Sequence, residues 1–80
     1  MLLRYMATAM REAHYEMLDE GASCYGEIPA CQGVFANAET LEACHDQLAE
    51  VLEDWVLLRV SRNLKLPIVD GAEIRLREIA

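Results

Sequence analysis

The stretch that decides the fold reads Tyr25-Gly26-Glu27-Ile28-Pro29, followed by Cys31-Gln32-Gly33, Val34-Phe35-Ala36 and, after Asn37-Ala38-Glu39, Thr40-Leu41-Glu42. It predicts a strand, a tight turn, a short strand and the start of a helix. Gly26 inside the first strand indicates a close backbone approach or a bulge. Pro29 ends that strand because it has no N–H to donate to the ladder. Thr40 is placed to cap the helix, although Ala43 stands where a capping-box Glu would be.

Outward from this stretch toward the N-terminus, the pattern completes an antiparallel meander. Residues 14–18 predict a first strand, and Asp19-Glu20-Gly21-Ala22 predicts a turn in which Gly21 can take positive φ. The returning strand is expected over residues 23–28 and the third over 34–36. Residues 2–13 predict an amphipathic helix whose apolar stripe comprises Leu3, Met6, Ala7, Met10 and Ala13.

Toward the C-terminus the pattern predicts the longest element, a helix from Thr40 to about Asn63. Arg59 and Arg62 suit the negative end of its dipole, and Asn63 suits a left-handed cap. Trp55 has two interpretations, an anchor of the core or an aromatic residue at a subunit interface. The expected apolar stripe of this helix comprises Leu41, Cys44, Leu48, Val51, Leu52, Trp55 and Leu58.

Residues 72–79 alternate strictly between apolar and charged side chains, which predicts a further strand after a turn at Asp70-Gly71. The predicted fold is therefore α+β, in the order α-β-β-β-α-β, with the meander packed on the long helix and all of residues 1–80 in one domain. The charged face of the last strand, with Glu73, Arg75 and Arg77, is a candidate partner-binding edge.

Composition limits the class of protein. A chain of 80 residues buries only about 60 to 65% of its unfolded surface, so support from a homo-oligomer, a dimer or a tetramer, is expected. With 54% apolar residues and no run long enough to span a bilayer, we expect a soluble domain, and the charges at Arg4, Arg11 and Glu12 argue against a signal peptide. We therefore expect a cytoplasmic protein with no membrane contact.

The net charge limits the class of partner, and the number and spacing of the cysteines indicate the state of the thiols. The net charge of −7, with seven scattered Lys and Arg residues, disfavours direct nucleic-acid binding and favours a basic partner. Cys24, Cys31 and Cys44 are an odd number without a Cys-x-x-Cys spacing, so reduced, buried thiols are expected.

Catalytic and metal chemistry find little support in the pattern. A zinc site would need convergence among His14, Cys24, Cys31, Cys44 and His45, but Cys44 and His45 are neighbours on a helix and point about 100° apart. Asp19, Glu20 and Glu27, like Glu53 and Asp54, fit solvated surface acids better than catalytic carboxylates. The glycines form no phosphate loop. We expect no enzyme activity and no cofactor.

A set of short motifs, in this order and spacing, resembles the HicB-like antitoxin family over nearly the whole chain. The motifs are His14-Tyr15-Glu16, Asp19-Glu20-Gly21, Tyr25-Gly26-Glu27-Ile28-Pro29, Gly33-Val34-Phe35-Ala36, Glu39-Thr40-Leu41-Glu42-Ala43, Leu52-Glu53-Asp54-Trp55 and Leu66-Pro67. The resemblance implies a partial RNase H-like arrangement and a protein that binds and neutralises a small basic HicA-type toxin, which cleaves mRNA.

The resemblance is not complete. Many family members continue into a C-terminal DNA-binding module, and with no such segment after residue 80 we expect no promoter binding. Two alternatives stay open: a homo-oligomeric structural or interaction domain without a toxin, and, less favoured, a metal-dependent ribonuclease H-like nuclease. The candidate partner-binding residues are Tyr25, Glu27, Glu73, Arg75 and Arg77, and the candidate anchors of the core or the oligomer are Met6, Met10 and Trp55.

Overall fold

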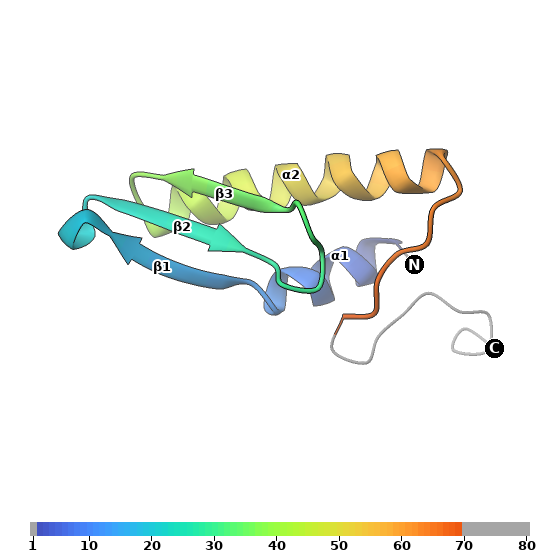
Figure 1. Ribbon diagram of the computed structural model, residues 1–80, viewed down its shortest axis with the longest axis horizontal. Helices are drawn as coiled ribbons and strands as arrows, with labels where there is room; N and C mark the ends of the chain where they lie inside the picture. The colour runs from blue at the N-terminus through green and yellow to red at the C-terminus, as the bar shows by residue number, and fades with distance from the viewer. Residues whose placement is uncertain (1, 70–80) are drawn as a thin grey trace.

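A computed structural model describes residues 2–69 as two helices and a three-stranded antiparallel sheet (Figure 1). The sheet order β1-β2-β3 is a meander, with α2 lying along one face. This confirms the predicted α+β class. The strand expected over residues 72–79, with Glu73, Arg75 and Arg77, lies outside the described residues. The elements are α1 (Leu2–Arg11), β1 (His14–Leu18), the 3₁₀ turn η1 (Asp19–Gly21), β2 (Ser23–Glu27), β3 (Phe35–Ala38) and α2 (Leu41–Ser61).

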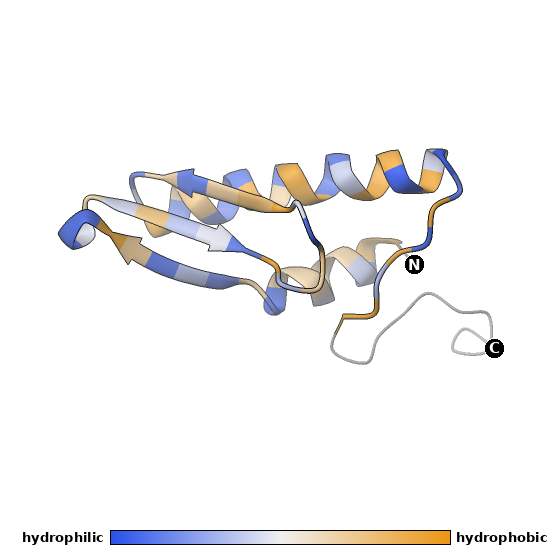
Figure 2. Cartoon of the chain, viewed as in Figure 1, coloured by the Kyte–Doolittle hydropathy of each residue, from blue (hydrophilic) through white to orange (hydrophobic). Residues whose placement is uncertain are grey.

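The β1–β2 connection is tighter than a simple glycine turn. Gly21 has φ 92°, as predicted, but Asp19 and Glu20 also lie in the left-handed region, with φ of 53° and 57°. Asp tolerates this region better than most residues, and the turn is hydrophilic (Figure 2). The turn sets the register that pairs Glu16 with Tyr25 and Tyr15 with Gly26.

The third strand begins one residue later than predicted and ends two residues later, at Ala38. Val34 belongs instead to the turn, because its N–H donates to the Cys31 carbonyl at 3.0 Å. Its own carbonyl accepts a hydrogen bond from the Ile28 N–H at 3.2 Å. This bond closes the loop, and the pairing of β3 with β2 begins at the next residue, Phe35. The expected strand over residues 34–36 was therefore wrong at both ends but right in kind.

The long helix starts as predicted. The Thr40 Oγ1 accepts a hydrogen bond from the Ala43 N–H at 3.0 Å, and Asn63 has φ 56° just after the helix ends. The core stripe of α2 recurs every four residues at Cys44, Leu48, Leu52 and Val56.

Two members of the stripe predicted for this helix were wrong. Leu41 and Leu58 remain 52% and 48% exposed, while Val56, outside the prediction, is buried. A four-residue spacing rotates gradually around a helix of 3.6 residues per turn. The buried side therefore turns from the sheet toward α1 along the length of α2.

The buried side of α1 also differs from the predicted stripe. Tyr5, Thr8 and Ala9 are buried, whereas Leu3 is 79% exposed and Met6 is half-buried. The Tyr5 hydroxyl donates to the Pro67 carbonyl, so it is satisfied inside the protein. The helix stops at Arg11, two residues before the predicted end.

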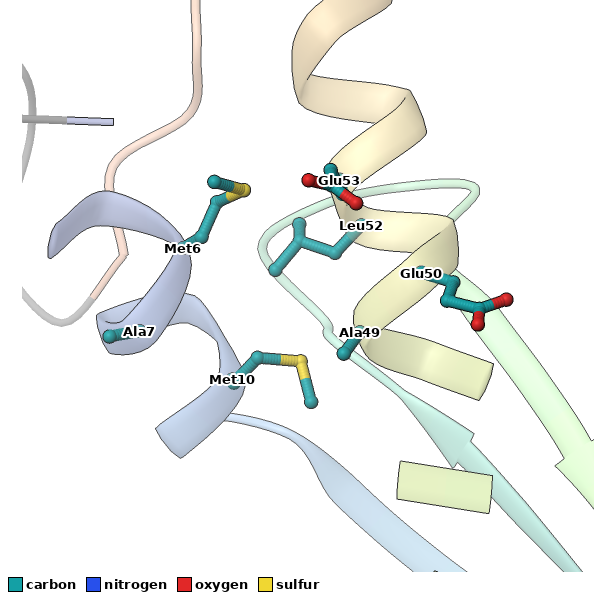
Figure 3. Close-up of a pocket in the computed structure, with 7 residues that line it drawn as sticks. All are labelled: Met6, Ala7, Met10, Ala49, Glu50, Leu52 and Glu53. Carbon is teal, nitrogen blue, oxygen red and sulfur yellow. The ribbon is translucent and has the colours of Figure 1, made fainter. Parts of the chain in front are cut away.

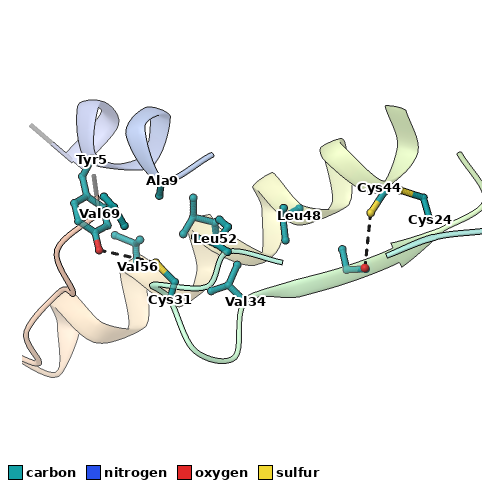
Figure 4. Close-up of a cluster of buried hydrophobic side chains, with 12 residues drawn as sticks. Tyr5, Ala9, Cys24, Cys31, Val34, Cys44, Leu48, Leu52, Val56 and Val69 are labelled. Carbon is teal, nitrogen blue, oxygen red and sulfur yellow. Dashed lines mark hydrogen bonds between the residues drawn. The ribbon is translucent and has the colours of Figure 1, made fainter. Parts of the chain in front are cut away.

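The core lies between α2, the sheet and α1 (Figure 4). Cys24, Cys31 and Cys44 are all buried, as predicted, and none of them pairs in a disulfide. Gly26 lies directly beneath the Tyr15 ring, so the predicted close approach is also confirmed.

Among residues 2–69, no helix has the length and apolar character needed to cross a bilayer.

Candidate functional site

The face of the sheet turned away from α2 is the candidate functional site. Side chains alternate across a strand, and α2 packs on the side of Cys24, Gly26 and Ala36. No described helix packs on the opposite side (Figure 1). We call this opposite side the open sheet face, and the register assigns to it His14, Glu16, Tyr25, Glu27, Phe35 and Asn37.

An aromatic pair lies on the open sheet face, with Tyr25 on the central strand and Phe35 at the start of β3. The rings of Tyr25 and Phe35 stack with centroids 6.3 Å apart and planes inclined by 26°. Phe35 is 57% exposed, which is unusual for a phenylalanine in a small domain. A large aromatic surface left in water on a regular strand makes Phe35 a candidate binding residue.

Carboxylates frame the aromatic pair. The Tyr25 hydroxyl donates to Glu27 Oε1 at 3.1 Å, and Glu16 lies directly opposite Tyr25 on β1. Desolvation and the neighbouring Glu27 carboxylate raise the pKa of Tyr25, so the phenol stays neutral and remains a donor. The site therefore combines two π-faces with two carboxylates, a combination suited to a guanidinium or ammonium group.

The wider charge distribution extends this acidic character. From Glu12 through Asp54 the chain contains no Lys or Arg, and every described Lys or Arg lies on α1, at the end of α2 or just after it. The basic residues, which the sequence analysis described as scattered, are confined in the described fold to α1, the end of α2 and the residues just after it. The whole sheet and the first half of α2 carry only negative charge apart from His14 and His45.

The structure brings some of the predicted site residues together and separates others. Tyr25 and Glu27 share the open sheet face. Met6 and Met10 lie elsewhere, in a groove between α1 and α2. Trp55 is half-buried against the core, with the Arg59 guanidinium carbon 5.0 Å from its ring centroid.

Phe35 and Glu16 are the residues of this site that the sequence interpretation missed, and Phe35 is the more informative of the two. Phe35 was assigned only to a strand, without a side. The signal that could have found it is register: Phe35 pairs with Glu27, so it must share a face with the residue already singled out.

The cysteines and histidines do not assemble a reactive centre among residues 2–69. Cys24 of β2 and Cys44 of α2 lie side by side between the sheet and α2 (Figure 4). Cys31 lies near Tyr5 at the other end of the core. Burial raises the pKa of both the Cys31 and the Cys44 thiol, which keeps them protonated and weakly nucleophilic. No metal-binding cluster of His, Cys, Asp and Glu occurs in this described range.

Comparison with known proteins places the chain in a family. A comparison with curated proteins found no significant match. Among solved structures, the chain is similar to the crystal structure of TTHA0281 from Thermus thermophilus, with a TM-score of 0.85 and 39% sequence identity, covering 94% of this chain and 93% of that one. The UPF0150-like family matches residues 4–67. This chain therefore belongs to the UPF0150-like family.

Proposed function

We propose that this protein is a HicB-like antitoxin that binds and neutralises a small basic HicA-type toxin, which cleaves mRNA, through the open sheet face. The observation that carries the proposal is the exposed Tyr25–Phe35 stack framed by Glu16 and Glu27. The motif set that resembles the HicB-like family supplies the class of partner. Such an encounter would take place in the cytoplasm.

The chemistry of the face favours a basic protein over RNA. Arg and Lys side chains can lie over the Tyr25 and Phe35 rings while they pair with the two carboxylates. RNA phosphates would instead meet a surface without Lys or Arg, so the same charges that attract a basic protein repel its substrate. Rigid aromatic anchors also lose little conformational entropy when a partner binds.

The antitoxin would neutralise the toxin by covering the toxin's RNA-binding surface. A toxin that binds RNA must present a basic surface, and an acidic antitoxin that occupies this surface competes with the RNA. Long-range attraction between opposite charges would speed their association, and salt would slow it.

The test is co-expression with the product of the neighbouring reading frame, followed by affinity and RNA-cleavage measurements. We expect the wild type to bind this product and block cleavage. Tyr25→Ala and Glu27→Lys should each weaken binding by at least about tenfold. Glu42→Lys, which reverses a carboxylate on the exposed surface of α2, away from the open sheet face, serves as the control and should change binding by less than about threefold.

Two results would count against the proposal. One is a neighbouring product that is not a small basic protein and does not bind in solution. The other is binding that Glu27→Lys and Glu42→Lys weaken equally, because the open sheet face would then have no special role.

The nuclease alternative lacks the geometry that its chemistry needs within the described residues. Asp19 lies in the β1–β2 turn and Glu27 at the far end of β2, which separates them by roughly 13 Å at 3.3 Å per residue. Two metal-holding carboxylates must approach one ion. The alternative of an oligomeric domain without a toxin shares the open sheet face and is distinguished by the co-expression test.

A further inference from the structure

A second surface that no other element among residues 2–69 covers lies in the groove between α1 and α2. The two helices run in opposite directions (Figure 1). Met6, Ala7 and Met10 form one wall, and Ala49, Leu52 and Glu53 line the other (Figure 3). The opening has a volume of about 300 Å³. Methionine walls adapt readily to a packed neighbour.

The apolar surface continues beyond the groove itself. Leu3 is one helical turn from Ala7 and is 79% exposed, and Leu57 is one turn from Glu53 and 53% exposed. Because the helices run antiparallel, both leucines flank the same end of the groove. A chain of this size rarely leaves so much aliphatic surface in water without a partner.

Opposite charges line the two shoulders of the groove. The α1 shoulder is formed by the exposed Arg4 and Arg11, which flank Ala7 one turn to either side, and the α2 shoulder by Glu50 and Glu53, which line the groove itself. No salt bridge joins these two shoulders within the described part of the chain. Arg11 donates one hydrogen bond to Thr8 Oγ1 at 3.2 Å, which leaves other guanidinium donors for a partner.

We infer that a second copy of this chain packs on the α1–α2 groove, about a twofold axis that runs along the groove. This operation places α1 of each protomer over α2 of its partner and keeps residues at the same level along the axis. Met6 lies at the level of Glu53, and Met10 at the level of Ala49 (Figure 3). Arg4 is therefore brought near Glu53 of the partner subunit, and Arg11 near Glu50 of the partner subunit.

The charges select this axis over the other in-plane choice. A twofold axis perpendicular to the groove would lay α1 on the partner's α1 and α2 on the partner's α2. Arginines would then face arginines and carboxylates would face carboxylates, and like charges in contact are unfavourable. The axis along the groove pairs opposite charges on both sides of a closed, isologous contact. It also brings Leu3 over Leu57 of the partner subunit.

The test is a charge-swap experiment on the full chain, with mass measured by light scattering and sedimentation at micromolar concentration. We expect the wild type to be a dimer or a higher assembly built from it. The double variants Arg4→Glu/Arg11→Glu and Glu50→Lys/Glu53→Lys should each lose this contact and halve the mass. Mixing the two variants should restore a one-to-one complex, because each then supplies the opposite shoulder.

Two controls separate this contact from general effects of charge. Glu16→Lys/Glu27→Lys makes the same charge change on the open sheet face and should leave the mass unchanged. The Glu50→Lys/Glu53→Lys variant moves the net charge toward zero, so general repulsion cannot explain its dissociation. Leu57→Asp changes a side chain that the single chain already exposes, so it should dissociate the dimer while thermal unfolding stays cooperative.

Several outcomes would overturn the inference. A strictly monomeric wild type means that the groove holds no second copy. A wild-type mass retained by both charge variants, or a mixture that forms no complex, would refute the proposed axis.

Discussion

Gly26→Ala is the substitution that most directly tests the packing between β1, β2 and α2. A Cβ at this position would lie 2.9 Å from both Cδ1 and Cε1 of Tyr15 and 3.0 Å from the Cys44 Sγ. Ordinary van der Waals contact begins near 3.4 Å, so the added methyl needs about half an ångström from the ring and somewhat less from the sulfur. Neither can yield freely, because the ring lies between a strand and a helix and Cys44 is fully buried.

Overpacking by one methyl group typically costs about 1–3 kcal/mol. For a domain of this size, each kcal/mol lowers the melting temperature by roughly 4–8 °C. We therefore expect Gly26→Ala to lower the free energy of unfolding by about 2 kcal/mol and the melting temperature by roughly 8–16 °C. Urea denaturation at fixed protein concentration measures the first quantity, and a thermal scan measures the second.

The matched experiment repeats Gly26→Ala in a Tyr15→Val background. Valine keeps a good strand residue but removes the ring, so the cost of the added methyl should fall by at least half, with the Cys44 contact accounting for the remainder. An equal cost in both backgrounds would refute the idea that the Tyr15 ring limits the space. A cost near zero in the wild type would refute the close approach itself.

Three further predictions concern the helices. Leu52→Ala should cost about 3 kcal/mol in unfolding free energy, whereas Leu58→Ala, on the same helix but 48% exposed, should cost less than about 1 kcal/mol; equal costs in urea denaturation would contradict the burial assigned to α2. Thr40→Ala removes the cap hydrogen bond to the Ala43 N–H and should cost about 1 kcal/mol, with Thr40→Ser nearly neutral in the same assay. Burial, together with the nearby Cys31, raises the pKa of Tyr5 above its ordinary 10.0, so the stability that its proton contributes is complete below pH 10 and is lost at higher pH. Alkaline unfolding curves should show a shallower decline above this pH for Tyr5→Phe than for the wild type, and identical slopes would argue against Tyr5 as the source.

The meander and the cap of α2 were predictable because their determinants are local. Gly21, Thr40 and Asn63 each act within a few residues of their own position, and the structure confirms all three. The alternation of residues 14–18 and 23–27 needs no knowledge of the remaining chain to specify two strands.

The buried sides of both helices were less predictable, because contacts with segments far away in the sequence determine which side is buried. Tyr5 and Thr8 carry polar atoms, so a binary pattern places them outside, yet the carbonyl of Pro67 accepts the Tyr5 hydroxyl and lets it enter the core. Leu3 and Leu58 satisfy the apolar periodicity but find no described neighbour to cover them. Periodicity identifies a helix and its amphipathic character, while tertiary contacts decide how far the stripe is rotated.

The candidate site was predictable only in part. Tyr25 and Glu27 stood out from their position on the central strand, but the stack with Phe35 depends on the pairing of β2 with β3. The run without Lys or Arg from Glu12 through Asp54 is visible in the sequence, but only the fold shows that it coincides with the sheet and the first half of α2.

The contact between Tyr5 and Pro67 bears on how this protein is made. The strands and α2 come from consecutive segments, so the contacts between them close only short loops. The Tyr5 hydroxyl, in contrast, finds its acceptor 62 residues later, and closing so long a loop carries an entropic cost that no early contact offsets. Tyr5 therefore gains this acceptor only once the chain is complete through Pro67, and a chain shortened before Pro67 should leave a buried hydroxyl without it.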